Sequence, residues 1–285
     1  MTLEAIEREA ATATGPARLL RDWIDRHARE RPDKAFVESI DQGKRITYGE
    51  LAVAANRIAH ALAARGIGRN DRVALLSNNS IEHLVTFIAT MAYGATCCTI
   101  HVEMNAVYFE DILKAVNARL VLWEDGLGLE RLADAVPGEW LPLGEWQGDA
   151  GTGWFAEVAR QPAGNPPSAG AGPDDVAEIV YTSGTSARPK GVVLTFSELE
   201  LNVEPTAAMF GLCEADRFLD YRSYNWVSAQ WLSCLGVLCR GATLVMGRKF
   251  SQSRLFDWIR DHKATIAAGN PTIINMMINR PVDIR

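Results

Sequence analysis

The 285-residue sequence has the composition of an ordinary globular protein, with 48% hydrophobic and 22% charged residues. Its formal net charge of -6 argues against a nucleic-acid-binding protein, because such proteins neutralise phosphates with a basic surface. Residues 1–15 contain acidic side chains and lack an apolar core segment, so they do not resemble a secretory signal. No apolar run approaches the roughly 20 residues that span a bilayer. We therefore expect a cytoplasmic protein without a membrane span; its oligomeric state is unknown from the sequence.

Apolar side chains recur along the chain with two alternating periods, one typical of helices and one typical of buried strands. A possible capping box at Thr47 and Glu50 marks the start of the second helix. In chain order we predict a helix at 19–28, a strand at 35–40, a helix at 47–66, a strand at 72–77, a helix at 80–92, a strand at 95–100, a helix at 105–116, strands at 118–123, 177–182 and 191–195, a helix at 197–210, a strand at 217–221, a helix at 227–238, a strand at 243–246, a helix at 254–262, a strand at 264–267 and a helix at 270–280.

Strands that alternate with helices of 10–15 residues predict an α/β fold in which layered, mostly parallel sheets are flanked by helices. Residues 125–160 have a weaker pattern and are expected to form a peripheral helix and loops. Proline, glycine and alanine dominate the segment before the next strand, which indicates a linker or surface loop. The predicted organisation is a mobile leader at 1–16, a first α/β subdomain at 17–160, the linker at 161–175, and part of a second subdomain at 176–285.

The cysteines and histidines do not indicate a metal site. The five cysteines form no CxxC pair, and the five histidines show no metal-ligand spacing. We interpret the cysteines as buried free thiols in a reducing compartment. Cys97 and Cys98 are adjacent in a predicted strand, so their side chains should point to opposite faces of the sheet.

The most informative segment, residues 181–191, reads YTSGTSARPKG and lies between two apolar strands. Its hydroxyl side chains and Gly184 allow backbone N–H and side-chain O–H donors to approach an anion closely. Lys190 adds a positive charge of the kind that binds phosphate. The segment is not a Walker A loop, because Pro189 and Gly191 stand where that motif requires glycine and a hydroxyl residue. A hairpin loop with a solvated lysine is the alternative, but eleven residues in this order favour a phosphate-binding loop.

This segment resembles the phosphate-binding signature of the adenylate-forming superfamily, commonly written YTSGTTGxPKGV. That superfamily contains acyl-CoA synthetases, luciferases and the adenylation domains of peptide synthetases. Ser186 replaces a threonine, Ala187 replaces a glycine, and Phe196 stands where the family usually has a histidine. Shorter matches at 47–51 (TYGEL) and 71–74 (DRVA) extend the resemblance over nearly the whole chain. The resemblance implies the N-terminal subdomains of the adenylate-forming fold, with the second sheet incomplete.

The same resemblance implies an AMP-forming acid–CoA ligase. Such an enzyme converts ATP and a small-molecule carboxylic acid to acyl-AMP and pyrophosphate, and then transfers the acyl group to CoA. The implied cofactors are ATP, Mg²⁺ and CoA. The resemblance gives Lys190 a catalytic role, because it would secure the loop and the leaving pyrophosphate. The residues implied in binding the ATP phosphates are Thr182, Ser183, Gly184, Thr185, Ser186 and Lys190.

A second part of the resemblance concerns the acid. Residues 221–226 occupy the place of the family's "PxFH" segment, which lines the acid-binding pocket, and Asn225 replaces the histidine. The implied pocket residues are Tyr224, Asn225 and Trp226, although Trp226 and Trp231 are also compatible with a role in the core. Residues 250–271 most resemble the branch that contains carnitine–CoA and crotonobetaine–CoA ligases.

Several family motifs have no counterpart in this sequence: the "YGxTE" segment, the "TGD" aspartate and the lysine of the C-terminal domain. We therefore expect a truncated ligase whose C-terminal domain is absent and whose isolated chain is inactive. Two alternatives remain. One is an adenylation domain that loads a carrier-protein thiol, and the other is a catalytically dead nucleotide-binding remnant.

Overall fold

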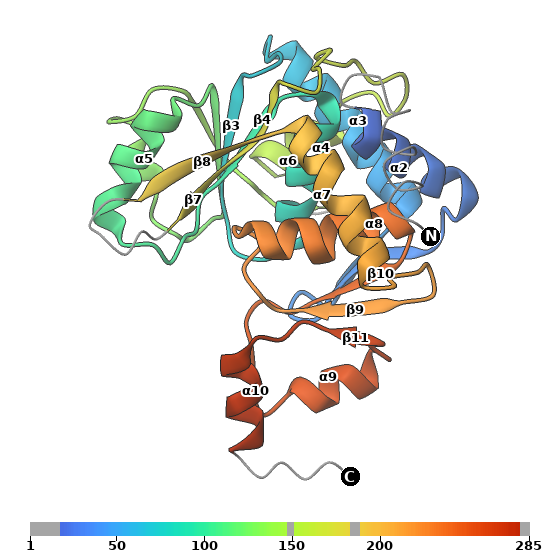
Figure 1. Cartoon of the computed structure of the whole chain (residues 1–285). Coiled ribbons are helices and arrows are strands. Elements are labelled where there is room, and N and C mark those ends of the chain that lie inside the picture. The colour runs from blue at the N-terminus through green and yellow to red at the C-terminus, as the bar shows by residue number, and fades with distance from the viewer. Residues whose placement is uncertain (1–17, 147–150, 183–188, 280–285) are drawn as a thin grey trace.

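Two mixed sheets and the helices around them build the molecule (Figure 1). The computed structural model describes residues 18–146, 151–182 and 189–279, so the predicted leader at 1–16 lies outside the described residues. The predicted α/β class with mostly parallel sheets is confirmed. Each sheet also contains one antiparallel pair of strands.

The larger sheet has six strands in the order β6-β5-β3-β4-β7-β8, and only β7 and β8 pair in antiparallel fashion. Its strands β3, β4 and β5 are buried on both faces, as in other parallel sheets covered by helices, whereas the edge strands β6 and β8 are partly or largely exposed. In β3, for example, Val73 and Leu75 belong to the central core, whereas Ala74 and Leu76 belong to a second core on the opposite face. The strands are β3 (Arg72–Leu76), β4 (Thr96–Thr99), β5 (Leu120–Trp123), β6 (Glu139–Pro142), β7 (Val176–Thr182) and β8 (Lys190–Thr195).

The smaller sheet has five strands in the order β11-β9-β10-β1-β2. Strands β1 and β10 are parallel neighbours, with Val37 opposite Leu244, although they lie far apart in the sequence. Each sheet combines strands from before and after residues 161–175. The predicted linker at 161–175 therefore does not divide the chain into two parts that each form one sheet. The strands are β1 (Ala35–Ser39), β2 (Lys44–Thr47), β9 (Arg217–Asp220), β10 (Thr243–Met246) and β11 (Ile266–Ala267).

The helices form layers around and between the sheets (Figure 1). Helices α2, α3, α4, α6, α7 and α8 contribute to the central core that both sheets share. Helix α5 covers the outer face of the larger sheet, and α9 and α10 cover the outer face of the smaller one. The helices are α2 (Arg18–Glu30), α3 (Tyr48–Ala64), α4 (Ile81–Tyr93), α5 (Phe109–Val116), α6 (Trp154–Ala159), α7 (Phe196–Met209), α8 (Gly236–Arg240), α9 (Leu255–Asp261) and α10 (Pro271–Ile278), with short 3₁₀ turns η1 (Ala106–Tyr108) and η2 (Glu130–Leu132) and a π-helix η3 (Ser228–Leu235).

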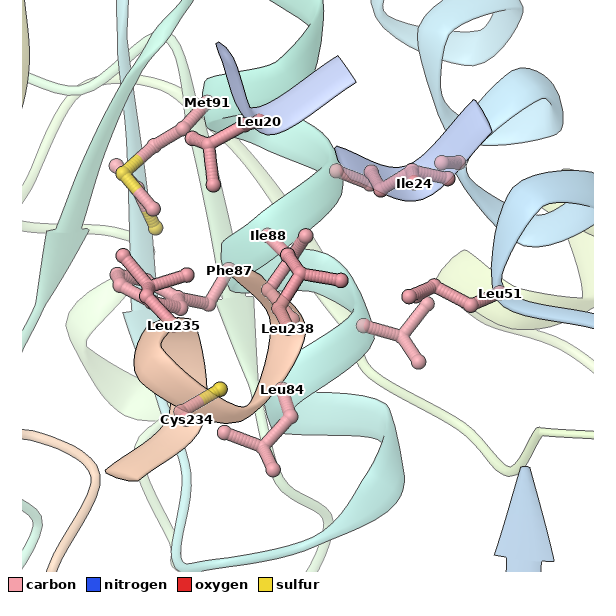
Figure 2. Packing of buried hydrophobic residues seen from close by; sticks show 14 of the residues in the cluster. Leu20, Ile24, Leu51, Leu84, Phe87, Ile88, Met91, Cys234, Leu235 and Leu238 are labelled. Carbon is pink, nitrogen blue, oxygen red and sulfur yellow. The ribbon is translucent and has the colours of Figure 1, made fainter. Parts of the chain in front are cut away.

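Helix α4 lies in the middle of this arrangement. Almost all of its residues are buried, although Glu82, His83, Thr86 and Thr90 among them are polar. Figure 2 shows Phe87 and Ile88 of α4 in one cluster with Leu235 of η3 and Leu238 of α8. This packing places η3 against the central helix, a position that matters for the site described below.

Three elements differ from the predicted pattern. Strand β2 is absent from the predicted elements, because its four residues KRIT are mostly polar and bury only Ile46 fully. Residues 125–160, expected to form a helix and loops, also contain strand β6, a partly exposed edge strand next to β5. The predicted helix at 227–238 begins as the π-helix η3. Short edge strands and wide helical turns leave no distinct periodicity in the sequence.

The cysteines follow their prediction with one exception. Cys97 belongs to the central core and Cys98 to the core beneath α5, which confirms that they lie on opposite faces of β4. All five thiols are free, and four of them are buried. Cys213 is exposed, contrary to the prediction, because it lies in the turn between α7 and β9.

The predicted capping box at the start of α3 is confirmed. The Thr47 hydroxyl accepts a hydrogen bond from the Glu50 backbone N–H at 3.2 Å, and the Glu50 carboxylate accepts one from the Thr47 N–H at 2.8 Å. Replacing Thr47 with alanine should therefore lower the free energy of unfolding by about 1 kcal/mol in urea denaturation. Thr47→Ser, which keeps the hydroxyl, should lose much less, and equal losses in both variants would contradict the capping role.

Candidate functional site

The hairpin of β7 and β8 carries the ends of the predicted phosphate-binding loop. Tyr181 pairs with Gly191, and Thr182 pairs with Lys190, the first residue of β8. Lys190 is exposed. A Cβ atom on Gly191 would lie 3.2 Å from the ring of Tyr181, so glycine leaves room for that ring to cross the neighbouring strand. The predicted loop residues Ser183, Gly184, Thr185 and Ser186 lie outside the described residues, as does the side chain of Thr182.

A cavity of about 800 Å³ opens beside this hairpin. Its walls come from segments at the carboxyl ends of strands in both sheets, which is where open α/β sheets bind ligands. Strand β7 contributes Val180 and Tyr181, so the predicted loop leaves β7 at the rim of the cavity. The remaining walls follow β3 (Asn78, Asn79), β4 (His101, Val102, Glu103, Met104), β9 (Tyr221, Arg222, Ser223, Asn225) and β10 (Arg248, Lys249, Phe250), with Trp226, Val227, Ser228 and Ile273.

A second cavity has nearly the same volume, about 790 Å³, so size alone does not decide between them. It lies between the start of α3 and helix α6, and its walls include Glu50, Arg57 and Phe155. Among the described residues, none of its walls comes from the predicted phosphate loop or acid pocket. We therefore take the cavity beside β7 as the candidate site.

The three predicted acid-pocket residues have different surroundings. Tyr224 is fully buried in the central core and does not line the cavity. Its backbone N–H donates to Asn79 at 2.9 Å, so it joins two walls of the cavity through its main chain. Asn225 and Trp226 do line the cavity. Asn225 is 3% exposed and donates to the Ser77 carbonyl at 3.0 Å.

Trp226 forms an exposed wall of the cavity. Its side chain is 55% exposed, and its ring lies against the imidazole of His101 with 5.8 Å between the ring centroids. Burial lowers the pKa of His101, although the nearby Glu103 carboxylate acts in the opposite direction. The imidazole and the indole, tilted by 37° to each other, therefore provide an aromatic wall for a ligand.

Three cations line the cavity, and each has an acidic partner. Arg222 lies 2.7 Å from the fully buried Asp220, and Arg248 lies 2.8 Å from Glu124. Lys249 pairs with Glu103 on the opposite wall. The walls are therefore close to electrically balanced, with guanidinium groups whose positions are set by their carboxylate partners.

Sequence reasoning did not single out His101, Arg222 or Arg248 as site residues. All three come within two residues of the carboxyl end of a predicted strand. Because ligands bind at that edge of a parallel sheet, the strand pattern itself was a signal for these positions.

Among the described residues, no group of three or more His, Cys, Asp or Glu side chains has the arrangement of a metal site.

Comparison with known proteins identifies the family. The model of the AMP-binding enzyme family matches residues 24–283. This chain belongs to the AMP-binding enzyme family.

Within the described ranges, no helix has both the length and the apolar character needed to cross a bilayer.

Relatives in the AMP-binding enzyme family include several acid–CoA ligases. The long-chain-fatty-acid–CoA ligase FadD13 of Mycobacterium tuberculosis is 30% identical over 248 residues, which cover 87% of this chain and 48% of the relative. The indoleacetate–CoA ligase of Aromatoleum aromaticum is 30% identical over 278 residues, covering 92% and 51%. The chain thus spans about half the length of these curated relatives.

A solved structure shares the fold. The inhibitor-bound N-terminal domain of FACL13 from Mycobacterium tuberculosis superimposes with a TM-score of 0.79 and 26% identity, over 94% of this chain and 66% of that one.

Proposed function

We propose that this chain supplies the ATP- and acid-binding part of an AMP-forming acid–CoA ligase. The observation that carries the proposal is the position of Tyr181, where the signature segment begins at the rim of the candidate cavity. A nucleotide whose phosphates bind the loop after Thr182 would thus lie next to a chamber of about 800 Å³ for the acid. The names of the relatives support CoA as the acceptor.

In this proposal the residues bind and orient two reactants. The carboxylate of the acid attacks the α-phosphorus of ATP, an acyl–phosphate bond forms, and the bond to pyrophosphate breaks. Negative charge accumulates on the leaving phosphates, where donors of the loop and the exposed Lys190 would stabilise it. Mg²⁺ would arrive with ATP. The acyl group would then pass to the thiol of CoA with release of AMP.

The finer features of the proposal rest on the sequence. We assign the phosphate contacts to Thr182, Ser183, Gly184, Thr185 and Ser186 as well as Lys190. The resemblance of residues 250–271 supports a place near the carnitine–CoA and crotonobetaine–CoA ligases, which we propose as the branch. The five unpaired cysteines support a cytoplasmic location.

Nucleotide binding is the direct test. With millimolar ATP and Mg²⁺, the amides of residues 181–191 should exchange hydrogen more slowly. Lys190→Ala should weaken ATP binding by about tenfold or more in isothermal titration calorimetry, because a charged contact to phosphate is lost. Lys44→Ala is the matched control. Lys44 is a partly exposed lysine on β2, pairs with Glu145, and lies away from the hairpin. Unchanged exchange at 181–191, or equal affinities for both variants, would contradict the proposal.

A further inference from the structure

A buried carboxyl group lies on β7 just before the cavity. Glu178 has no exposed surface and precedes Val180, which lines the cavity, by two residues. Trp231 donates its indole N–H to one carboxyl oxygen at 3.0 Å. Thr99 lies 3.4 Å from the other oxygen, and the Thr99 hydroxyl also accepts the amide N–H of Gln230 at 2.9 Å. One acidic side chain thus connects β4, β7 and η3.

The chemistry of this contact is that of a neutral acid. Burial raises the pKa of Glu178 to about 8, although the hydrogen bonds from Trp231, Gln230 and Thr99 oppose that rise. Trp231 donates to one carboxyl oxygen and the Thr99 hydroxyl donates to the other. A glutamine amide has the same shape and no charge; its oxygen can accept from Trp231, and its NH₂ group can donate to the Thr99 hydroxyl oxygen. Glutamine is therefore the substitution that keeps this connection at neutral pH.

The element held by Glu178 is the π-helix η3, which lies between the two sheets. Gln230 and Trp231 bind the side of the larger sheet, whereas Ser233 donates to the buried Asp220 on β9 of the smaller sheet. Figure 2 shows Cys234 and Leu235 packed against α4, which gives the helix a third support. Wide π-turns are uncommon and often occur at functional sites.

The first turn of η3 is continuous with the wall of the cavity. The Trp226 carbonyl accepts the backbone N–H groups of Ala229 at 3.0 Å and Gln230 at 3.1 Å. Trp226, Val227 and Ser228 all line the cavity. A shift of Gln230 and Trp231 would therefore move this wall relative to Tyr181 on β7.

We propose that Glu178 is a positioning residue for the cavity: its bonds to Trp231 and, through Thr99, to Gln230 hold the first turn of η3 and set where Trp226 stands opposite Tyr181. The inference rests on the proposed function only in treating this cavity as the binding site. Glu178 does not touch a ligand in this role. It acts through η3.

The test follows the environment of Trp226 by ¹⁹F NMR of the full chain labelled with 5-fluorotryptophan. The chain contains eight tryptophans, and Trp226→Phe identifies the Trp226 signal by its disappearance. We expect Glu178→Leu to displace or split the Trp226 signal, because Trp231 and Thr99 lose their partner. Glu178→Gln should leave the signal at its original shift. An unchanged signal in Glu178→Leu, or equal displacement in both variants, would overturn the proposal.

A variant in the core distinguishes a specific displacement of Trp226 from a general loosening of the fold. Leu62 is fully buried at the far end of α3, and Leu62→Ala is expected to destabilise the chain without touching η3. Its Trp226 signal should stay in place, and a displacement like that of Glu178→Leu would overturn the proposal. If Glu178→Leu does not fold, Trp231→Phe removes the donor instead and should displace the Trp226 signal; no displacement would overturn the proposal. None of these measurements needs ATP, so a failure of nucleotide binding would contradict the proposed function alone.

Discussion

Replacing Arg222 with methionine is expected to lower the free energy of unfolding by about 3 kcal/mol. The substitution leaves the Asp220 carboxylate without its cation, and this side chain has no exposed surface. Removing one partner of a buried ion pair typically costs about 3–5 kcal/mol. Asp220 keeps the Ser233 hydroxyl and the backbone N–H of residue 222 as donors, which places the expected loss at the lower end of that range.

Urea denaturation followed by circular dichroism measures this loss. The double variant Asp220→Leu with Arg222→Met should lose less than Arg222→Met alone, because it leaves no unpaired charge in the interior. Lys114→Met is a control on an exposed pair with Glu110, where we expect about 0.5 kcal/mol or less. If Arg222→Met loses no more free energy of unfolding than this control, the buried Asp220 carboxylate does not depend on Arg222 as its ion-pair partner.

The second large effect is on the pH dependence of stability. The folded-state pKa of Glu178, about 8, lies above the ordinary value of 4.5, so the folded chain retains a proton that the unfolded chain releases. Stability from this group is therefore full below pH 4.5 and is lost as the pH rises towards 8. Fully buried His83 acts in the opposite sense, because burial lowers its pKa from 6.5 to about 4 and stability is lost as the pH falls through that range.

The interval from pH 6.5 to 8 separates the two groups. There the unfolded His83 passes from half to almost fully neutral and contributes little. The loss from Glu178 should amount to roughly 2 kcal/mol, because the slope approaches about 1.4 kcal/mol per pH unit below the folded pKa. The nearby thiols of Cys97, Cys98 and Cys234 have pKa values raised by burial above 9.0 and contribute little in this interval.

Glu178→Gln supplies the comparison, because glutamine does not titrate. Urea denaturation at a series of pH values should show a flatter profile for Glu178→Gln than for the natural chain between pH 6.5 and 8. Identical slopes for the two proteins would mean that Glu178 is already ionised at neutral pH. Such a result would remove the reason for treating glutamine as its equivalent.

Much of the fold is visible in local sequence patterns. The strand at 243–246 is found at its predicted bounds, and the capping box at Thr47 is present. The elements that were missed are short and partly polar, such as β2 with its single fully buried residue Ile46. A pattern of period two needs several alternations to be recognised, and four residues supply too few.

The candidate site divides in the same way. The order of hydroxyl residues, glycine and lysine in residues 181–191 identifies the family, because a chemical motif is local. Asn225 and Trp226 were expected in the acid pocket and line the cavity, whereas the ring of Tyr224 points into the core. The side chains of neighbouring residues in a turn point in different directions, and only the surrounding packing decides which of them is buried.

The amino-acid order alone therefore specifies the alternation of strands and helices, the family signature and the free thiols, since each depends on residues close together in the chain. The pairing of β1 with β10, the cavity between two sheets, and the links from η3 to Glu178 and Asp220 depend on the tertiary structure. These features join segments that are distant in sequence, and they are stabilised by burial of surfaces that no local pattern pairs with one another.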